Sequence, residues 1–168
     1  MGNLMGCLAE REANRERGHT YWVRCVAKLT DTTFVSGSGD KTLKLWNKEN
    51  GSVIRTFRGH TSDVRCVAKL TDTTFVSGSN DHTLILWNTE DGSVIRTFQE
   101  HALYVGCVAK LTDTTFVSGS SDNTLKFWNT EERLFWFYLL RDRLPLPEHL
   151  VFELTQHLKE NEFIMTYK

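Results

Sequence analysis

The chain has 168 residues and a formal net charge of −1, and 40% of its residues are hydrophobic and 11% aromatic. This length fits one ordinary domain, or a domain with a short appendage. The hydrophobic content excludes a disordered chain, and the balanced charge indicates no nucleic-acid partner. No run reaches the roughly 18 apolar residues that a membrane-spanning helix requires.

Residues 1–17 form a charged N-terminal segment that begins "MGNLMGC". Gly2 is a candidate myristoylation site and Cys7 a candidate palmitoylation site, and two acyl chains would anchor the protein stably. Position six is Gly6 rather than the Ser or Thr that myristoylation favours, and "EREANRER" supplies no polybasic patch. The sequence therefore predicts a cytoplasmic protein that reaches a membrane only if this segment is acylated.

The segment "CVAKLTDTTFVSGS" occurs three times without a change, beginning at Cys25, Cys66 and Cys107. The period of 41 residues indicates an array of supersecondary units and matches the roughly 40–45 residues of a four-stranded propeller blade. Cysteines at equivalent places in separate units do not meet, so we expect small buried side chains in a reducing compartment. The Cys and His spacings match no metal-site pattern, and the sequence predicts neither a metal nor a cofactor.

Four strands are predicted in each unit, and in the first they read "RCVAKL", "FVSGS", "TLKLW" and "SVIRTF". The turn "TDTT" joins the first two strands, and Asp31 can bond to its own backbone there. The next turn contains "GD", "ND" or "SD" in successive units, residues that tolerate unusual backbone angles. The segments "NKENG" and "NTEDG" provide the turn before the fourth strand.

The motifs "GH", "SGSxD" and "LWN" recur in register, and with them residues 18–129 resemble the WD-repeat β-propeller family. The Asp that usually follows the Trp is replaced in each copy, by Asn47, Asn88 and Asn129. The resemblance implies an all-β fold of three four-stranded antiparallel blades, at residues 18–58, 59–99 and 100–140. Because closed propellers use about 4–8 blades, this propeller is incomplete.

In that family a His, a Ser or Thr, a turn Asp and the strand Trp form a hydrogen-bonded tetrad inside each blade. The matching residues are His19, Ser36, Asp40 and Trp46, then His60, Ser77, Asp81 and Trp87, then His101, Ser118, Asp122 and Trp128. Such a tetrad would satisfy the polar groups of a half-buried layer. A catalytic triad would instead need an exposed nucleophile at one privileged site, whereas this trio occurs three times. We therefore expect no enzyme.

The turn "GSGDKT" also looks like a phosphate-binding loop. Such a loop requires G-x-x-x-x-G-K-[ST] between a strand and a helix. Here Asp40 separates the second glycine from Lys41, and a strand follows. The other two copies place His82 and Asn123 at the position of Lys41, so the turn requires no cation.

Differences between the copies gather on one rim, formed by the loop before each first strand and the turn between the second and third strands. We call it the variable rim. Its candidate partner-binding residues are Tyr21, Trp22, Arg24, Lys41, Asp63, Arg65, His82, Leu103, Tyr104 and Asn123. Aromatic residues and Arg dominate interface hot spots, which favours a protein or peptide partner. The alternative is drift after duplication, because Lys48 and Thr89 also differ on the opposite rim.

After Trp128 the repeat breaks. The segment "RLFWFYLL", at residues 133–140, suits the fourth strand of the third blade or a patch against a partner. Residues 141–168 are predicted to form a helical tail from Pro147, with leucines at a spacing of four. This tail would cover an open blade edge. Alternatively, "LPLPEHLVFELTQHL" resembles the opening of an F-box or the end of a SOCS box, which recruit ubiquitin-ligase scaffolds.

The sequence thus predicts a non-enzymatic scaffold that binds proteins through the variable rim. One alternative is a substrate adaptor of a ubiquitin ligase that uses the C-terminal helix. Another is a structural sector of an oligomeric propeller, or a truncated descendant of a longer array. An open arc of three blades exposes unpaired strand edges and apolar faces, which associating copies or the tail would have to cover.

Overall fold

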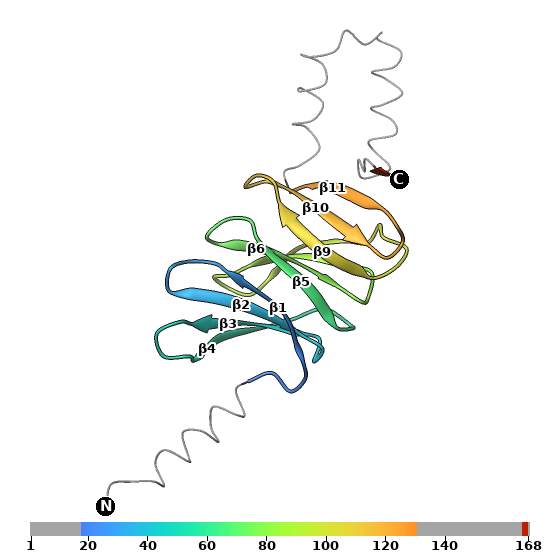
Figure 1. Ribbon diagram of the computed structural model, residues 1–168. Helices are drawn as coiled ribbons and strands as arrows, with labels where there is room; N and C mark the ends of the chain where they lie inside the picture. Colours follow the sequence, from blue (N-terminus) through green and yellow to red (C-terminus); the bar gives the residue numbers. More distant parts are fainter. Residues whose placement is uncertain (1–17, 131–165, 168) are drawn as a thin grey trace, which may run out of the picture.

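The computed structural model describes residues 18–130 and 166–167. These residues form three four-stranded antiparallel sheets that lie side by side (Figure 1), as the sequence predicts. The strands are β1 (Val23–Lys28), β2 (Thr33–Ser38), β3 (Thr42–Asn47), β4 (Val53–Arg58), β5 (Val64–Lys69), β6 (Thr74–Ser79), β7 (Leu84–Asn88), β8 (Val94–Phe98), β9 (Val105–Lys110), β10 (Thr115–Ser120), β11 (Leu125–Asn129) and β12 (Thr166–Tyr167).

Each sheet is one blade, and its strands pair in chain order. Blade 1 is β1-β2-β3-β4, blade 2 is β5-β6-β7-β8 and blade 3 is β9-β10-β11-β12. The first strands of successive blades contact one another, β1 with β5 and β5 with β9, so they line one side of the array. Val23 pairs with Ser38, which brings the start of β1 and the end of β2 to the same rim.

The apolar core lies between blades because side chains alternate between the two faces of a strand. We call the face that packs on the following blade the leading face, and the face that packs on the preceding blade the trailing face. The first core cluster joins the leading face of blade 1 to the trailing face of blade 2: Leu29, Val35, Leu43, Leu45, Phe57, Val64, Phe75, Ile85 and Trp87. The second joins blades 2 and 3 in the same way: Cys66, Leu70, Val76, Leu84, Leu86, Phe98, Val105, Phe116 and Trp128. Blade 2 is therefore buried on both faces.

The fourth strand of blade 3 comes from the C-terminus. Tyr167 pairs with Leu125, the register that joins Phe57 to Leu43 in blade 1 and Phe98 to Leu84 in blade 2. Residues 133–140, which were expected here, lie outside the described residues, and Thr166 and Tyr167 take the place beside β11 instead. The prediction of a helix through residue 168 is wrong at these two positions, because an unpaired strand edge offers backbone hydrogen bonds to any segment that reaches it.

Two faces have no blade against them within the part of the chain that the structure describes, the trailing face of blade 1 and the leading face of blade 3. The three equivalent cysteines show the consequence, since all lie on leading faces. Cys66 is buried and Cys25 is half-buried, but Cys107 is exposed. The expectation that all three are buried is thus wrong for Cys107, because no following blade covers it.

Other predictions fall on residues that the structure does not describe: the N-terminal segment with Gly2 and Cys7, and the helix from Pro147. In residues 18–130 and 166–167, no helix is long and apolar enough to cross a membrane.

Candidate functional site

All four predicted members of the tetrad meet in blade 2. His60 lies between Asp81 and Ser77, with Nδ1 2.9 Å from the Asp81 carboxylate and Nε2 2.8 Å from the Ser77 hydroxyl. Trp87 donates its indole N–H to the same hydroxyl over 2.8 Å. The chain of contacts runs from β7 through β6 to the loop before β5, and so ties that loop to the sheet.

The direction of these hydrogen bonds follows from the groups themselves. An indole N–H only donates, so the Ser77 oxygen accepts from Trp87. Its single hydrogen is then directed to His60 Nε2, which leaves Nδ1 as the protonated nitrogen that donates to Asp81. With this assignment each polar group of the layer has a partner.

The same arrangement recurs in the other blades. In blade 1, Ser36 Oγ lies 2.8 Å from His19 and 2.7 Å from Trp46. In blade 3, the corresponding distances from Ser118 to His101 and Trp128 are both 2.7 Å. The Asp40 carboxylate lies 2.8 Å from its histidine and the Asp122 carboxylate 2.9 Å. The three predicted tetrads are therefore all formed.

Each tetrad has a fifth member that sequence reasoning missed. Thr83 donates both its backbone N–H and its hydroxyl to Asp81, over 3.0 and 2.7 Å. Asp81 also accepts the backbone N–H of Thr61. Thr42 and Thr124 bind Asp40 and Asp122 in the same way. The signal was present in "DKT", "DHT" and "DNT", where the Thr stays constant while the residue before it changes.

These hydrogen bonds set the ionisation of the carboxyl groups. Burial raises the pKa of Asp40, but hydrogen bonds from Thr42, His19 and the backbone outweigh it and lower the pKa to about 2. The pKa of Asp81 is lowered in the same way, with burial opposed mainly by His60 and Thr83. Each carboxylate is thus a fixed negative charge that organises the turn after the second strand.

The tetrads offer no exposed nucleophile. Ser77 is completely buried, and it donates to His60 while it accepts from Trp87. Catalysis would require an oxygen that faces substrate, together with donors for the developing charge. The geometry instead suits a structural role, in which the tetrad holds the variable rim to the sheet.

The turn at the tip of each tetrad is not a phosphate loop, because it connects two strands of one sheet. Its third residue has a left-handed backbone in every copy, with φ of 68° at Lys41, 70° at His82 and 67° at Asn123. The sequence pattern assigns the tolerance of unusual angles to the two preceding residues, Gly39 and Asp40 in blade 1, but the left-handed position is the residue after them. The turn thus holds the side chain of Lys41 out into solvent at the rim.

The variable rim of blade 1 carries an exposed aromatic pair. Tyr21 and Trp22 stack with ring centroids 5.1 Å apart, and they are 53% and 64% exposed. Arg24 lies over the Trp22 ring at 5.1 Å and reaches across to Asp63 of blade 2 at 3.1 Å. A Cβ at Gly39 would come within 2.4 Å of the Tyr21 ring, so this glycine makes room for the pair. We call Tyr21, Trp22, Arg24 and Asp63 the rim cluster.

The other candidate residues of the rim divide into two groups. Arg65 is half-buried and joins two blades, because it donates to Asn80 and lies 5.1 Å from the Tyr104 ring of blade 3. Asp63 is likewise occupied by Arg24. The remaining candidates are exposed: Lys41, His82, Leu103, Tyr104 and Asn123. The variable rim thus exposes apolar and aromatic side chains to solvent. Beside them lie charged side chains that contacts between neighbouring blades hold in place.

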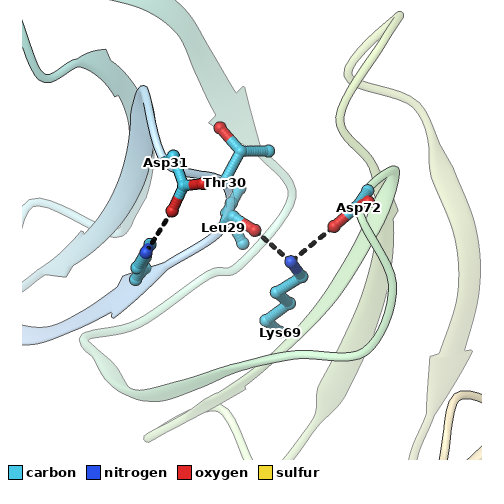
Figure 2. Close-up of a pocket in the computed structure, with 6 residues that line it drawn as sticks. Leu29, Thr30, Asp31, Lys69 and Asp72 are labelled. Carbon is cyan, nitrogen blue, oxygen red and sulfur yellow. Dashed lines mark hydrogen bonds and ion pairs between the residues drawn. The ribbon is translucent and has the colours of Figure 1, made fainter.

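The opposite rim is hollowed between blades 1 and 2, over a volume of about 420 Å³. Figure 2 shows Lys69 reaching from one side of this hollow to the Leu29 carbonyl and to Asp72. Lys28 is bonded to Asp31 on the other side at 2.5 Å. Because both ammonium groups already have carboxylate partners, the hollow is a seam between blades rather than a site for an anionic ligand.

No group of three or more His, Cys, Asp or Glu side chains is placed to hold a metal ion among the residues that the structure describes. The thiols of Cys25 and Cys66 are not activated, since burial raises the pKa of Cys25 to about 11 and that of Cys66 to about 12.

Known proteins share this architecture. The family model described as "WD domain, G-beta repeat" matches residues 12–47, 51–88 and 92–129. These repeats are staggered against the sheets: the second contains β4 of blade 1 and β5, β6 and β7 of blade 2. The second and third repeats therefore each contain strands of two blades, whereas the described strands of the first all belong to blade 1, and the fourth strand of blade 3 falls outside all three repeats.

Two similar proteins extend this finding. The WD40 β-propeller domain of Doa1 has a solved structure that superposes with a TM-score of 0.64 at 35% identity, over 68% of this chain and 39% of that chain. The pre-mRNA-splicing factor PRP46 of Candida glabrata is 44% identical over 43 residues, which are 24% of this chain and 10% of that protein. The chain thus spans well under half the length of either relative.

Proposed function

Because the chain belongs to the WD40 repeat family, we propose that it is a non-enzymatic scaffold whose variable rim binds a protein or peptide. The observation that carries the proposal is the rim cluster. Two stacked aromatic rings that are more than half exposed are costly in water unless a partner covers them. Aromatic and Arg side chains are also the groups that most often dominate the energy of protein interfaces.

The geometry of the cluster supports this role. Arg24 is held by Trp22 and Asp63, so it loses little side-chain freedom when a partner docks. Tyr21 and Trp22 are supported from below by the turn at Gly39, whose backbone N–H donates to the Trp22 carbonyl over 2.9 Å. The cluster is thus a preorganised apolar platform with a charge at its edge.

The relatives limit the proposal to this general role. The match to the splicing factor has the length of a single repeat, so it supports the blade and not a role in splicing. Residues 144–158, which carry the resemblance to an F-box or SOCS box, lie outside the described residues. We also place the protein in the cytoplasm, a proposal supported by Cys25, Cys66 and Cys107, the three cysteines that the structure describes, all of which are free.

Selection and affinity measurements test the proposal. Peptides are selected on the immobilised chain from a displayed library, and their Kd is measured by titration calorimetry with the wild type and with Trp22→Ala and Tyr104→Ala. We expect a loss of about tenfold or more for Trp22→Ala, because a hot-spot residue contributes about 2 kcal/mol or more. The matched control is Ile95→Ala, an exposed apolar residue of β8 that lies away from the rim. Binders that tolerate both rim variants would exclude the variable rim as the binding surface.

A further inference from the structure

The two ends of the array expose side chains that the interior of the array buries. Val23 on the trailing face of blade 1 is 57% exposed, whereas its equivalents Val64 and Val105 are completely buried. Leu125 on the leading face of blade 3 is 50% exposed, whereas its equivalent Leu84 is buried. The end faces are therefore formed by the same residue types as the junctions inside the chain.

The first contact of an internal junction is a valine that packs on a glycine. A Cβ on Gly37 would lie 2.6 Å from Val64 of the next blade, and one on Gly78 would lie 2.7 Å from Val105. The glycines therefore form the hole that receives the valine. At Gly119 of blade 3 the near neighbours belong to its own blade, and the hole has no valine in it within the described part of the chain.

The second contact is aromatic. Phe57 of blade 1 meets Phe75 of blade 2 edge-on at 5.0 Å, and Trp87 at 5.6 Å. Phe98 of blade 2 meets the corresponding pair of blade 3 in the same way. Blade 1 carries the same pair, Phe34 and Trp46, stacked 6.1 Å apart. On blade 3 the backbone register places Tyr167 at the position of Phe57 and Phe98.

The third contact is polar. Lys69 donates to the Leu29 carbonyl of the preceding blade, and Lys110 donates to the Leu70 carbonyl. Lys28, the equivalent residue of blade 1, is bonded to Asp31 alone among the described residues. At the other end, the carbonyl of Leu111 receives no lysine from any residue that the structure describes. Among the residues that the structure describes, one end therefore has a lysine that donates to no backbone carbonyl, and the other end has a carbonyl that accepts from no lysine.

We propose that the trailing face of blade 1 docks on the leading face of blade 3 of a second copy, so that two copies close a six-bladed ring. In this junction Val23 enters the hole at Gly119, Lys28 donates to the Leu111 carbonyl, and Phe34 and Trp46 meet the strand that contains Tyr167. The two contacting faces differ from each other, so the contact is head-to-tail. Repeating such a contact gives either a closed ring or an open chain of copies. Two copies close it, and six blades lie within the about 4–8 of closed propellers.

The first test is the mass of the full chain in solution, measured by sedimentation velocity and light scattering over a range of concentrations. We expect a discrete species of twice the chain mass of 19.4 kDa. A chain that stays monomeric at every concentration would overturn the proposal, as would a ladder of growing species, which would mean that the head-to-tail contact does not close.

Substitutions on each face identify the contact. Val23→Asp and Leu125→Asp each place a carboxylate in one side of the junction, and we expect each to abolish the dimer. Both positions are exposed in the single chain, so the fold tolerates the change. Ile95→Asp is the matched control, because Ile95 is equally exposed on β8 but lies outside the end faces, and it leaves the dimer intact.

Mixing the two variants separates a head-to-tail contact from a symmetric one. Val23→Asp chains keep an intact leading face on blade 3, and Leu125→Asp chains keep an intact trailing face on blade 1. An equimolar mixture therefore regains association through one junction, although more weakly than the wild type. A mixture that stays monomeric, or a dimer that only one of the substitutions disrupts, would overturn the head-to-tail arrangement.

A milder substitution tests the junction without placing a new charge on an apolar face. Lys28→Met keeps the length of the side chain and removes the ammonium group that would donate to Leu111. The loss of this charge-assisted hydrogen bond at each junction weakens the dimer by about tenfold or more. If the Kd of the Lys28→Met dimer equals that of the wild-type dimer, the contact between Lys28 and Leu111 is not part of the interface.

Discussion

The indole N–H of Trp87 donates to the hydroxyl of Ser77 over 2.8 Å, and both side chains are completely buried. This bond links the third strand of blade 2 to the second strand, and through His60 to the loop of the variable rim. The residues that could be mistaken for a catalytic triad thus hold the loops of the variable rim in position. Substituting a tetrad residue should therefore lower the free energy of unfolding directly, and should affect partner binding only through the position of the rim loops.

Removing the central hydroxyl should destabilise blade 2 more than blade 1. Ser77→Ala leaves the Trp87 N–H and His60 Nε2 without a partner in a buried site, which costs about 3 kcal/mol. Ser36→Ala costs about 1 kcal/mol, because Trp46 is half-buried on an end face and water can replace the bond. Urea unfolding followed by tryptophan fluorescence measures both values. Equal losses would mean that the two tetrads are equally shielded from water.

Acid should destabilise the protein in two stages. His101 has a pKa lowered below its ordinary value of 6.5, mainly by burial, so the unfolded chain takes up this proton first and stability declines as the pH falls below about 6.5. The pKa of Asp40 is lowered from 3.8 to about 2, so its contribution is complete above about 3.8 and disappears as the pH falls toward 2. The pKa of Asp122 is also lowered, so this carboxyl group likewise stabilises the fold above about pH 3.8, and its contribution is lost only at still lower pH than that of Asp40.

The urea midpoint at pH 8, 5 and 3 measures this effect, and we expect a small decrease at the first step and a large decrease at the second. Asp122→Asn removes one of the depressed carboxyl groups and should flatten the second step while it lowers the midpoint at pH 8. A midpoint that rises between pH 8 and pH 3 would contradict the direction of these pKa shifts.

The left-handed turn position offers a stabilising change. Lys41 has φ of 68°, a conformation that is strained for most side chains and that Asn tolerates, as Asn123 does at the same place in blade 3. Lys41→Asn should therefore raise the free energy of unfolding by about 0.5–1 kcal/mol. Lys48→Asn, an exposed lysine on the opposite rim with ordinary φ, is the control and should change little. A loss of stability at position 41 would show that Lys41 makes a compensating contact.

The repeat explains why so much of the fold could be predicted from sequence. Three identical segments in register identify the strands, and the His, Ser, Asp and Trp positions follow from the family pattern without any knowledge of packing. The contacts of Asp63 and Arg65 could not be predicted in this way. Both depend on which residue the neighbouring blade places opposite, and that residue differs from one junction to the next.

Two of the failures concern relations beyond one repeat. Cys107 has the sequence context of Cys66, but its exposure depends on a following blade. β12 is separated from β11 by more than thirty residues, so spacing alone gave no reason to pair them. A signal was nevertheless present: "FIMTYK" at the C-terminus shares the Ile, the Thr, the aromatic residue and the final basic residue of "VIRTFR", the fourth strand of blade 1.

The glycines opposite the valines give a final prediction, which compares a filled hole with an open one. Gly78→Ala places a Cβ 2.7 Å from both Cys66 and Val105, between two blades that cannot separate without exposing their core. This overpacking should cost about 2–3 kcal/mol. Gly119→Ala meets Cys107 and Leu125 of its own blade, which are exposed and can shift, so its cost should be about 1 kcal/mol or less.

Both variants are compared by urea unfolding in the Val23→Asp background, so that self-association does not contribute to the measured stability. The order of the two losses is the decisive result. If Gly119→Ala destabilises as much as Gly78→Ala, a side chain already occupies the hole at Gly119 within the single chain. If it destabilises less, the hole is open, and the same substitution in the wild-type background should block the dimer because Val23 of the second copy can no longer enter.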